Sequence, residues 1–281
     1  MTARRGYLWR LAGVTAALAV LPGAAALADE EATALARAAQ NPIAAMVSLP
    51  LQSNTNFNIG PYDRTGEVFN VQPVVPITLN SDWNVILRVI VPFIYRPNAV
   101  FDSGGGSGLG DINATAFFSP SKGGSFIWGI GPTFTAPTAT KTKLGLEKVS
   151  LGTEKWSAGP AAVGLFITGP WVAGALINQQ WSFAGKDSRE KVSALLIQPF
   201  VNYNMAQGWY LTSSPVITAN WNPAPGAGKW TVPLGAGVGK IFKVAGQAMN
   251  GQIAAYYNIE KPTRDSSDWQ LRAQLTFLFP R

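Results

Sequence analysis

The chain contains neither histidine nor cysteine among its 281 residues. Without histidine it cannot build a Ser-His-Asp triad, and without cysteine it has no thiol nucleophile and no disulfide. The usual nitrogen and sulfur ligands of metal ions are missing as well. The sequence therefore predicts no metal site and no cofactor. Carboxylate pairs drawn from Asp111, Glu154 and Glu260 stay open in principle, but structural or loop roles are favoured for them.

Charge is also scarce. Only 13% of the residues are charged, about half the usual share of a soluble domain, while 47% are hydrophobic. No apolar run after residue 28 reaches the ~20 residues that a membrane-spanning helix needs. The chain thus has too little charge for an ordinary wetted surface and no segment that predicts a transmembrane helix.

Residues 1–28 resemble a secretory signal peptide. Arg4, Arg5 and Arg10 precede an apolar run over residues 11–21, and Ala26-Leu27-Ala28 supplies small residues for cleavage. A membrane anchor is the weaker interpretation, because the run is short and Pro22 and Gly23 interrupt it. Removal of this segment lowers the net charge from +7 to +4, so the basic character does not call for nucleic acid as a partner.

The mature chain alternates apolar and polar residues with the period of β-strands. Residues 29–42 are predicted as a short periplasmic segment that Asn41-Pro42 ends, and residues 43–281 as a β-barrel. About twelve stretches alternate over roughly ten residues or a little more, as tilted membrane strands do. They span residues 43–57, 67–80, 83–96, 109–120, 125–138, 154–168, 170–183, 191–206, 209–222, 229–240, 246–260 and 268–281. The predicted fold is an all-β, antiparallel transmembrane barrel.

The connections support this prediction, because long polar ones such as "NIGPYDRTG" and "AGKDSREK" alternate with short ones such as "NS" and "QG". Long loops on one side and tight turns on the other are typical of outer-membrane barrels. Tryptophans follow the same division and are predicted to form two interfacial girdles. Those beside short turns are Trp83, Trp171 and Trp209, and those near long loops are Trp156, Trp181, Trp221, Trp230 and Trp269.

Proline argues against the barrel. A closed sheet has no free edge to hide a missing N–H, yet many prolines fall inside the predicted strands. They are Pro50, Pro73, Pro76, Pro92, Pro132, Pro160, Pro199, Pro215 and Pro233. Bulges would absorb some of them. A soluble β-sandwich is the alternative, but its outer faces would need far more charge.

Several stretches, among them "SGLGDINATAFFSP", "IWGIGPTFTAPTAT", "IQPFVNYN" and "LTFLFPR", resemble the family named for the meta-cleavage pathway of phenol degradation. Its members are Gram-negative outer-membrane barrels often labelled "transporter". The resemblance covers nearly all of the mature chain and implies uptake of aromatic or other hydrophobic compounds. The chain ends in Pro280-Arg281 rather than in an aromatic residue, so we expect the assembly machinery to recognise Phe277 and Phe279.

The alternation turns four charged residues toward the lumen, and they are the candidate pore-lining residues: Arg88, Asp111, Lys155 and Arg272. Interior salt bridges are the alternative role for them. We expect a passive channel or facilitator for small molecules, with an envelope-structural or surface-interaction barrel as the alternative and an enzyme as the least favoured class. The expected partners are outer-membrane lipid and lipopolysaccharide, the assembly machinery and a small-molecule cargo, with no nucleic acid.

Overall fold

The computed structural model describes residues 33–99, 101–145, 147–262 and 266–280, and the predicted signal peptide lies outside them. Seventeen strands are present, and fifteen of them form one sheet. They are β1 (Val47–Ile59), β2 (Arg64–Val71), β3 (Val74–Thr78), β4 (Trp83–Pro97), β5 (Gly105–Leu109), β6 (Ile112–Pro120), β7 (Phe126–Ala136), β8 (Lys141–Leu144), β9 (Glu147–Ser150), β10 (Lys155–Thr168), β11 (Trp171–Gly185), β12 (Ser193–Asn204), β13 (Trp209–Ser213), β14 (Ile217–Asn220), β15 (Trp230–Val244), β16 (Gln247–Glu260) and β17 (Trp269–Phe279).

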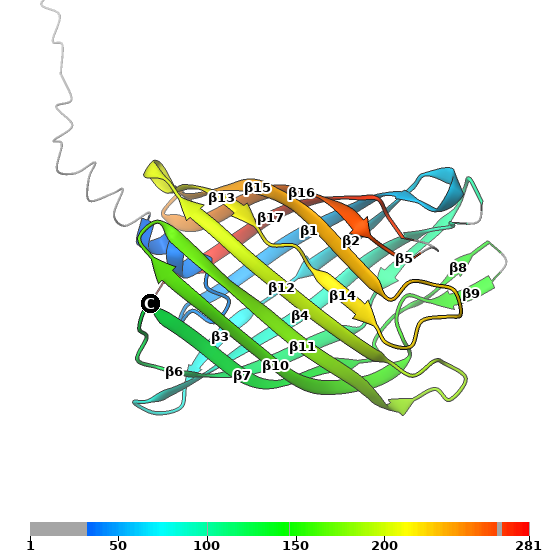
Figure 1. Cartoon of the computed structure of the whole chain (residues 1–281), viewed down its shortest axis with the longest axis horizontal. Helices are drawn as coiled ribbons and strands as arrows, with labels where there is room; N and C mark the ends of the chain where they lie inside the picture. Colours follow the sequence, from blue (N-terminus) through cyan, green and yellow to red (C-terminus); the bar gives the residue numbers. More distant parts are fainter. Residues whose placement is uncertain (1–32, 100, 146, 263–265, 281) are drawn as a thin grey trace, which may run out of the picture.

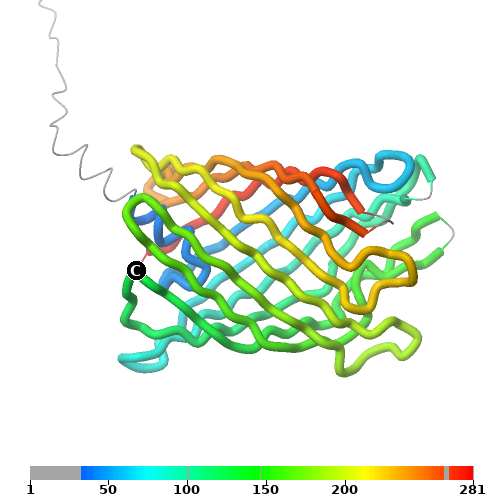
Figure 2. The backbone as a smooth tube through the Cα atoms, in the orientation of Figure 1, coloured from blue at the N-terminus to red at the C-terminus, as the bar shows by residue number. Residues whose placement is uncertain are grey.

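The large sheet closes into a barrel, because β1 pairs with β17 and β11 pairs with β12. Three of the twelve wall strands are each split in two, as β2 and β3, β5 and β6, and β13 and β14. All neighbours are antiparallel, and the strands are steeply tilted (Figures 1 and 2). The predicted twelve-stranded barrel is confirmed. One boundary differs, since Ile241–Val244 continues β15 where the sequence suggested a connection.

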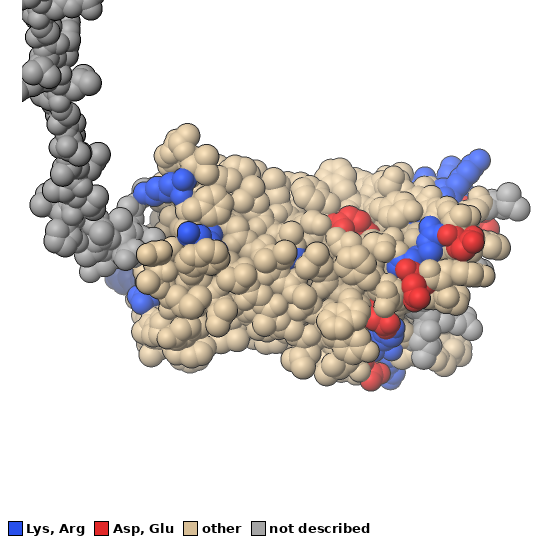
Figure 3. All heavy atoms as spheres, turned by 90° about the horizontal axis from the view of Figure 1, so that it is seen from above, with Lys and Arg blue, Asp and Glu red and all other residues tan. Residues whose placement is uncertain are grey.

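The wall alternates as the sequence predicts, with large apolar side chains exposed on the outside. Leu87, Ile130, Phe166 and Leu234 lie within strands of the wall and are each between 38% and 63% exposed. On the face drawn in Figure 3, charged residues gather toward the two ends and leave a broad band almost free of charge. Such a band is the surface that a bilayer covers. We call the end with the short turns periplasmic and the end with the long loops extracellular.

Five of the nine in-strand prolines lie at interruptions of the hydrogen-bond ladder. Pro73 and Pro215 occupy the gaps that split two of the wall strands, and Pro92 and Pro199 lie opposite such gaps on neighbouring strands. Pro233 sits at a register shift between β15 and β16. At these positions no ladder hydrogen bond requires an N–H from the proline, so the missing N–H breaks no bond. These prolines are therefore compatible with a closed barrel.

Pro132 and Pro160 make a different interruption, because they face each other across β7 and β10. Each has lost the N–H that would bond to the strand on its other side, and no pair forms there between Thr115↔Thr133 and Phe118↔Ile130. The preceding residue is glycine in both cases. A Cβ at Gly131 would lie 1.8 Å from the carbonyl oxygen of the neighbouring strand, so only glycine fits beside that displaced carbonyl.

A short helix at residues 33–39 precedes the barrel and lies at its periplasmic end (Figure 1). Ala36 is 1% exposed and packs with Met46, Ile241, Ala248 and Leu278 on the inner wall. Among the described residues no helix is long and apolar enough to cross a membrane. The segment predicted as periplasmic therefore contacts the barrel interior directly.

Candidate functional site in the barrel lumen

The lumen has an apolar side formed by inward-facing residues of β4, β6, β10, β11 and β12. Ile86, Phe117, Leu165 and Val172 are almost fully buried there. Ile43 of the N-terminal segment joins this cluster. The apolar cluster fills part of the interior as a core does in a small barrel.

The N-terminal segment, residues 33–46, is also held by hydrogen bonds. Gln40 and Asn204 exchange two side-chain bonds of 2.8 and 3.1 Å, and Arg37 donates to the carbonyl of Gly169 at 2.7 Å. Gly169 forms the tight turn between β10 and β11, and Asn204 ends β12. The segment thus closes much of the periplasmic opening and is fixed to the turns around it.

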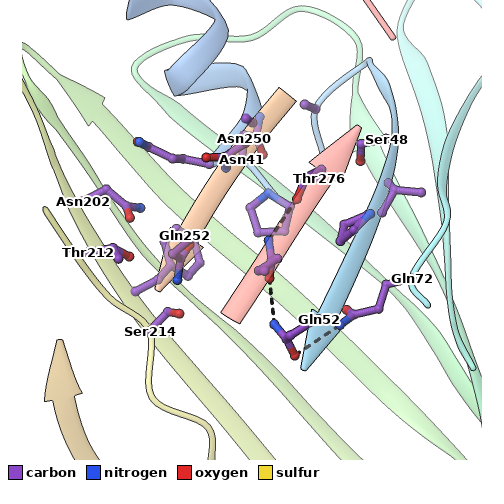
Figure 4. Close-up of a pocket in the computed structure, with 18 of the residues that line it drawn as sticks. Asn41, Ser48, Gln52, Gln72, Asn202, Thr212, Ser214, Asn250, Gln252 and Thr276 are labelled. Atoms are coloured by element: carbon purple, nitrogen blue, oxygen red, sulfur yellow. Dashed lines mark hydrogen bonds between the residues drawn. The ribbon is translucent and has the colours of Figure 1, made fainter. Parts of the chain in front are cut away.

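Above this segment lies a cavity of about 160 Å³, the lumen cavity (Figure 4). Polar side chains from opposite parts of the wall point into it, with Asn202, Thr212 and Ser214 on one side and Gln52 and Gln72 on the other. Its apolar lining comes from Met46, Pro50, Val74, Leu176 and Phe200. The lumen cavity therefore has a mixed lining of amides, hydroxyls and apolar side chains.

Arg88 projects from β4 into this cavity. Its guanidinium donates to Oε1 of Gln72 at 2.8 Å, and Gln72 donates in turn to Gln52 at 3.3 Å. The Gln52 amide continues to Gln274 at 2.7 Å. The hydrogen-bond partner of Arg88 among the described residues is the neutral amide of Gln72, and the described residues that line the cavity include no acidic one. The side chain is partly exposed, and inside the barrel that exposed surface faces the cavity.

Arg272 of β17 also reaches the cavity but is 3% exposed and surrounded by partners. Its Nε donates to Asn54 at 3.1 Å, and its terminal nitrogens donate to the carbonyl of Ser214 at 2.8 Å and to Gln270 at 3.2 Å. The guanidinium also lies 4.8 Å from the ring centre of Tyr256. Because Ser214 belongs to the gap between β13 and β14, Arg272 bridges that gap to β17.

The other two predicted pore-lining residues, Asp111 and Lys155, meet near Thr153 at the extracellular end. Asp111 accepts the Thr153 amide at 2.7 Å and its hydroxyl at 2.8 Å, and it also accepts the Ala139 amide at 3.2 Å. The Lys155 amide donates to the Thr153 hydroxyl at 3.3 Å. Asp111 thus anchors the loop between β7 and β10, while Arg88 and Arg272 alone of the four line the cavity.

A second charged group, Glu154, holds the same loop. Its carboxylate lies 2.8 Å from Nζ of Lys141, 3.4 Å from Nε of Arg189 and 3.8 Å from Nζ of Lys186. The hydrogen bond from Lys141 lowers the pKa of Glu154 below its usual value. The extracellular loops before β10 and before β12 are therefore tied together by one carboxylate.

Between the cavity and the extracellular end, the inner wall carries hydroxyls and amides that satisfy one another. Asn113 donates to Thr133 at 3.1 Å and to Thr135 at 3.0 Å, Thr115 donates to Thr133 at 2.9 Å, and Thr135 donates to Gln180 at 2.7 Å. These mutual bonds make this stretch a structural lining.

On the outer wall, an apolar groove of about 1030 Å³ surrounds the interruption at Pro132 and Pro160. Ile130, Ala162 and Ile177 line it from the lipid-facing side. Gly131 and Gly159 also line it, although their alternation places them on the lumen side. The groove therefore reaches into the thickness of the wall where the ladders β6–β7 and β10–β11 are interrupted.

The eight predicted interfacial tryptophans lie near the ends of strands, and seven are 38–51% exposed, while Trp230 is partly buried. Several contact aromatic or basic neighbours. Trp171 lies 4.8 Å from the ring of Tyr203, and Lys240 lies 4.7 Å over the ring of Trp209. Their role at the membrane interface stays a prediction.

Sequence reasoning missed the buried hydrogen bond from Tyr210 to Asn250, at 2.8 Å, and the bonds of Gln40 in the lumen. In the sequence, the only indication of a role for Gln40 was its polar side chain within the stretch "ARAAQNP". Nothing in the sequence near Gln40 indicated that it bonds to Asn204. Within the described ranges, no group of three or more acidic side chains is arranged to hold a metal ion.

The fold defines the class of the protein as a closed, twelve-stranded antiparallel β-barrel of the outer-membrane type. No family model and no curated protein matches the sequence. The structure is similar to the COG4313 outer membrane channel from Pseudomonas putida F1, with 16% identity, a TM-score of 0.59, and coverage of 83% of this chain and 94% of that one.

Two further similarities are weaker. The translocator domain of the autotransporter NalP from Neisseria meningitidis has 9% identity and a TM-score of 0.48, covering 92% of this chain and 96% of that one. The CymD monoaromatic hydrocarbon channel has 8% identity and a TM-score of 0.45, covering 92% and 93%. At such identities the comparisons concern the fold.

Proposed function

We propose that the protein is a passive outer-membrane channel for small, largely apolar molecules, aromatic compounds among them. The observation that carries the proposal is the apolar groove at Pro132 and Pro160, where two ladders of the wall are interrupted. A lipid-facing wall needs no such interruption for stability, and each interrupted ladder leaves backbone groups without their usual partners. The interruption therefore favours a role in passage.

The lumen supports the same proposal. The N-terminal segment fills the periplasmic end, so a molecule that enters from the extracellular side and passes the polar stretch reaches the apolar cluster and the lumen cavity before that end. The wall beside this cluster is the part that contains Gly159 and Ala161, which also line the groove. A route from the lumen into the membrane would suit apolar molecules. It accords with the resemblance to the phenol-degradation family and with the similarity to an outer membrane channel.

The test fills the groove from outside. Ala162→Trp adds a large apolar side chain on the groove surface, and Ala175→Trp adds the same side chain at an exposed wall position outside the groove. Uptake of N-phenylnaphthylamine, an apolar dye that fluoresces in lipid, is followed in intact cells. We expect Ala162→Trp to reduce the rate to that of cells without the protein and Ala175→Trp to leave it unchanged.

Equal uptake by cells with and without the wild-type protein would contradict transport of apolar molecules and favour the structural barrel. Equal uptake by both tryptophan variants and the wild type would exclude the groove as the route. The folded fraction of each variant is compared by its migration before and after boiling.

A further inference from the structure

We propose that the lumen cavity binds a small organic monoanion with an apolar body, of the size of a monocyclic aromatic carboxylate. This inference rests on the proposed channel function and adds the chemical class of a ligand to it. The carboxylate would pair with Arg88, and the ring would lie against Leu176 and Phe200.

Charge is the first argument. Two guanidinium groups, of Arg88 and Arg272, line the cavity, and its lining contains no aspartate, glutamate or lysine. A buried cation without a counter-charge is costly, because neutral amides replace only part of its hydration. An anion that enters the cavity supplies the missing charge, and a cation would be repelled.

The second argument is the unequal state of the two arginines. Arg272 uses all three nitrogens in bonds to Asn54, Ser214 and Gln270, so its role is to brace the wall. Among the described residues, Arg88 donates one side-chain hydrogen bond, from one terminal nitrogen to Gln72. Its other guanidinium nitrogens can therefore donate the paired bonds that a guanidinium makes with a carboxylate.

Apolar lining and size are the third argument. Leu176, Phe200, Val74 and Met46 form a surface that gains by contact with a hydrocarbon body, whereas a bare inorganic anion would leave it unused. The cavity volume of about 160 Å³ is close to the ~150 Å³ of an apolar cavity that binds benzene. A single ring with one carboxylate fits this volume.

The experiment is calorimetric titration of the full mature protein in a neutral detergent at low salt. Benzoate is compared with benzamide, its neutral analogue, with benzylamine, a cation, and with acetate, an anion without a ring. We expect saturable one-site binding of benzoate, at least tenfold weaker binding of benzamide and acetate, and none of benzylamine. Raised salt should weaken the benzoate affinity, because chloride competes for the guanidinium.

Arg88→Gln should weaken benzoate binding at least tenfold and leave benzamide binding unchanged, and Arg88→Lys should keep part of the affinity. Lys122→Gln, in an exposed periplasmic turn, is the matched control and should bind as the wild type does. Heat-dependent migration establishes that each variant is folded. Where Arg88→Gln fails to fold, the comparison of benzoate with benzamide on the wild type decides the matter.

Equal affinities for benzoate and benzamide, unchanged benzoate binding in Arg88→Gln, or no binding of benzoate to the wild type would each overturn the inference. Equal binding of acetate and benzoate would overturn its aromatic part and leave a simple anion site. Loss of dye uptake with intact benzoate binding would contradict the channel function alone. Intact dye uptake without benzoate binding would contradict this inference alone.

Discussion

Val89 and Ile90 are neighbours in β4 whose side chains lie on opposite faces of the wall. Val89 shares the outer phase of Leu87 and pairs with Ala114, near the middle of the strand. We expect Val89→Arg to lower the free energy of unfolding by about 2–4 kcal/mol, because arginine at the bilayer midplane loses its hydration. Ile90→Arg should cost less. Equal costs in urea titrations of protein folded into lipid vesicles would show that the assigned faces are wrong.

The contribution of Glu154 to holding the extracellular loops depends on pH. Its pKa is lowered from 4.5 chiefly by the hydrogen bond from Lys141, so the loop is held most firmly when the carboxylate is ionised. The stabilisation is present above the usual pKa and is lost as pH falls through the lowered one. Acidification below that range should release the hairpin of β8 and β9, which carries Lys141, from its contact with Glu154.

Pepsin cleavage of the hairpin across an acidic pH series measures this release. Glu154→Gln cannot ionise, so we expect it to be cut faster than the wild type at the upper end of the series and equally fast at the lower end. The ratio at each pH removes the pH dependence of pepsin itself. A constant ratio across the series would contradict the assigned role of Glu154.

At the scale of elements, the N-terminal segment controls the periplasmic opening. Because the natural chain has no cysteine, Gln40→Cys with Asn204→Cys supplies the only two thiols. A short bis-methanethiosulfonate reagent should bridge them, since the native side chains are bonded at 2.8 Å. We expect the bridged protein to conduct less in a planar bilayer than the same protein after reduction.

Deletion of residues 29–42 provides the complementary variant. Its unitary conductance should exceed that of the wild type, because the helix no longer occupies the lumen end. A deletion variant and a bridged variant with the same conductance as the wild type would show that ions do not pass through the region that the segment fills.

At the scale of the whole molecule, closure is the source of stability. Every wall strand has a partner on each side, so unfolding exposes backbone groups along the full circumference. We expect the mature protein to fractionate with outer membranes and to migrate faster in SDS before boiling than after it. Recovery as a soluble periplasmic monomer with a single migration would contradict the membrane assignment.

Much of this fold could be predicted from local pattern. The alternation around Leu87 and Val89 assigned the outer face, and the long and short connections set the strand count and the direction of the ends. These properties are local, because a side chain's face depends on its phase in the strand and a loop's length is read directly. The same phase turned Arg88 and Arg272 inward.

Contacts between distant segments were decided only by tertiary structure. Asp111 and Lys155 have the same inward phase as Arg88, but they contact Thr153 and do not line the cavity. The packing of the loop before β10 and the gap between β5 and β6 decide which groups these two residues contact. In the sequence, Pro132 and Pro160 argued against a barrel. In the structure they lie opposite each other on β7 and β10, at one interruption of the sheet, and are compatible with the fold. The sequence by itself therefore determined period, phase and membrane topology. Strand register and barrel closure decided which inward residues share the cavity, since these depend on pairings between residues far apart in the chain.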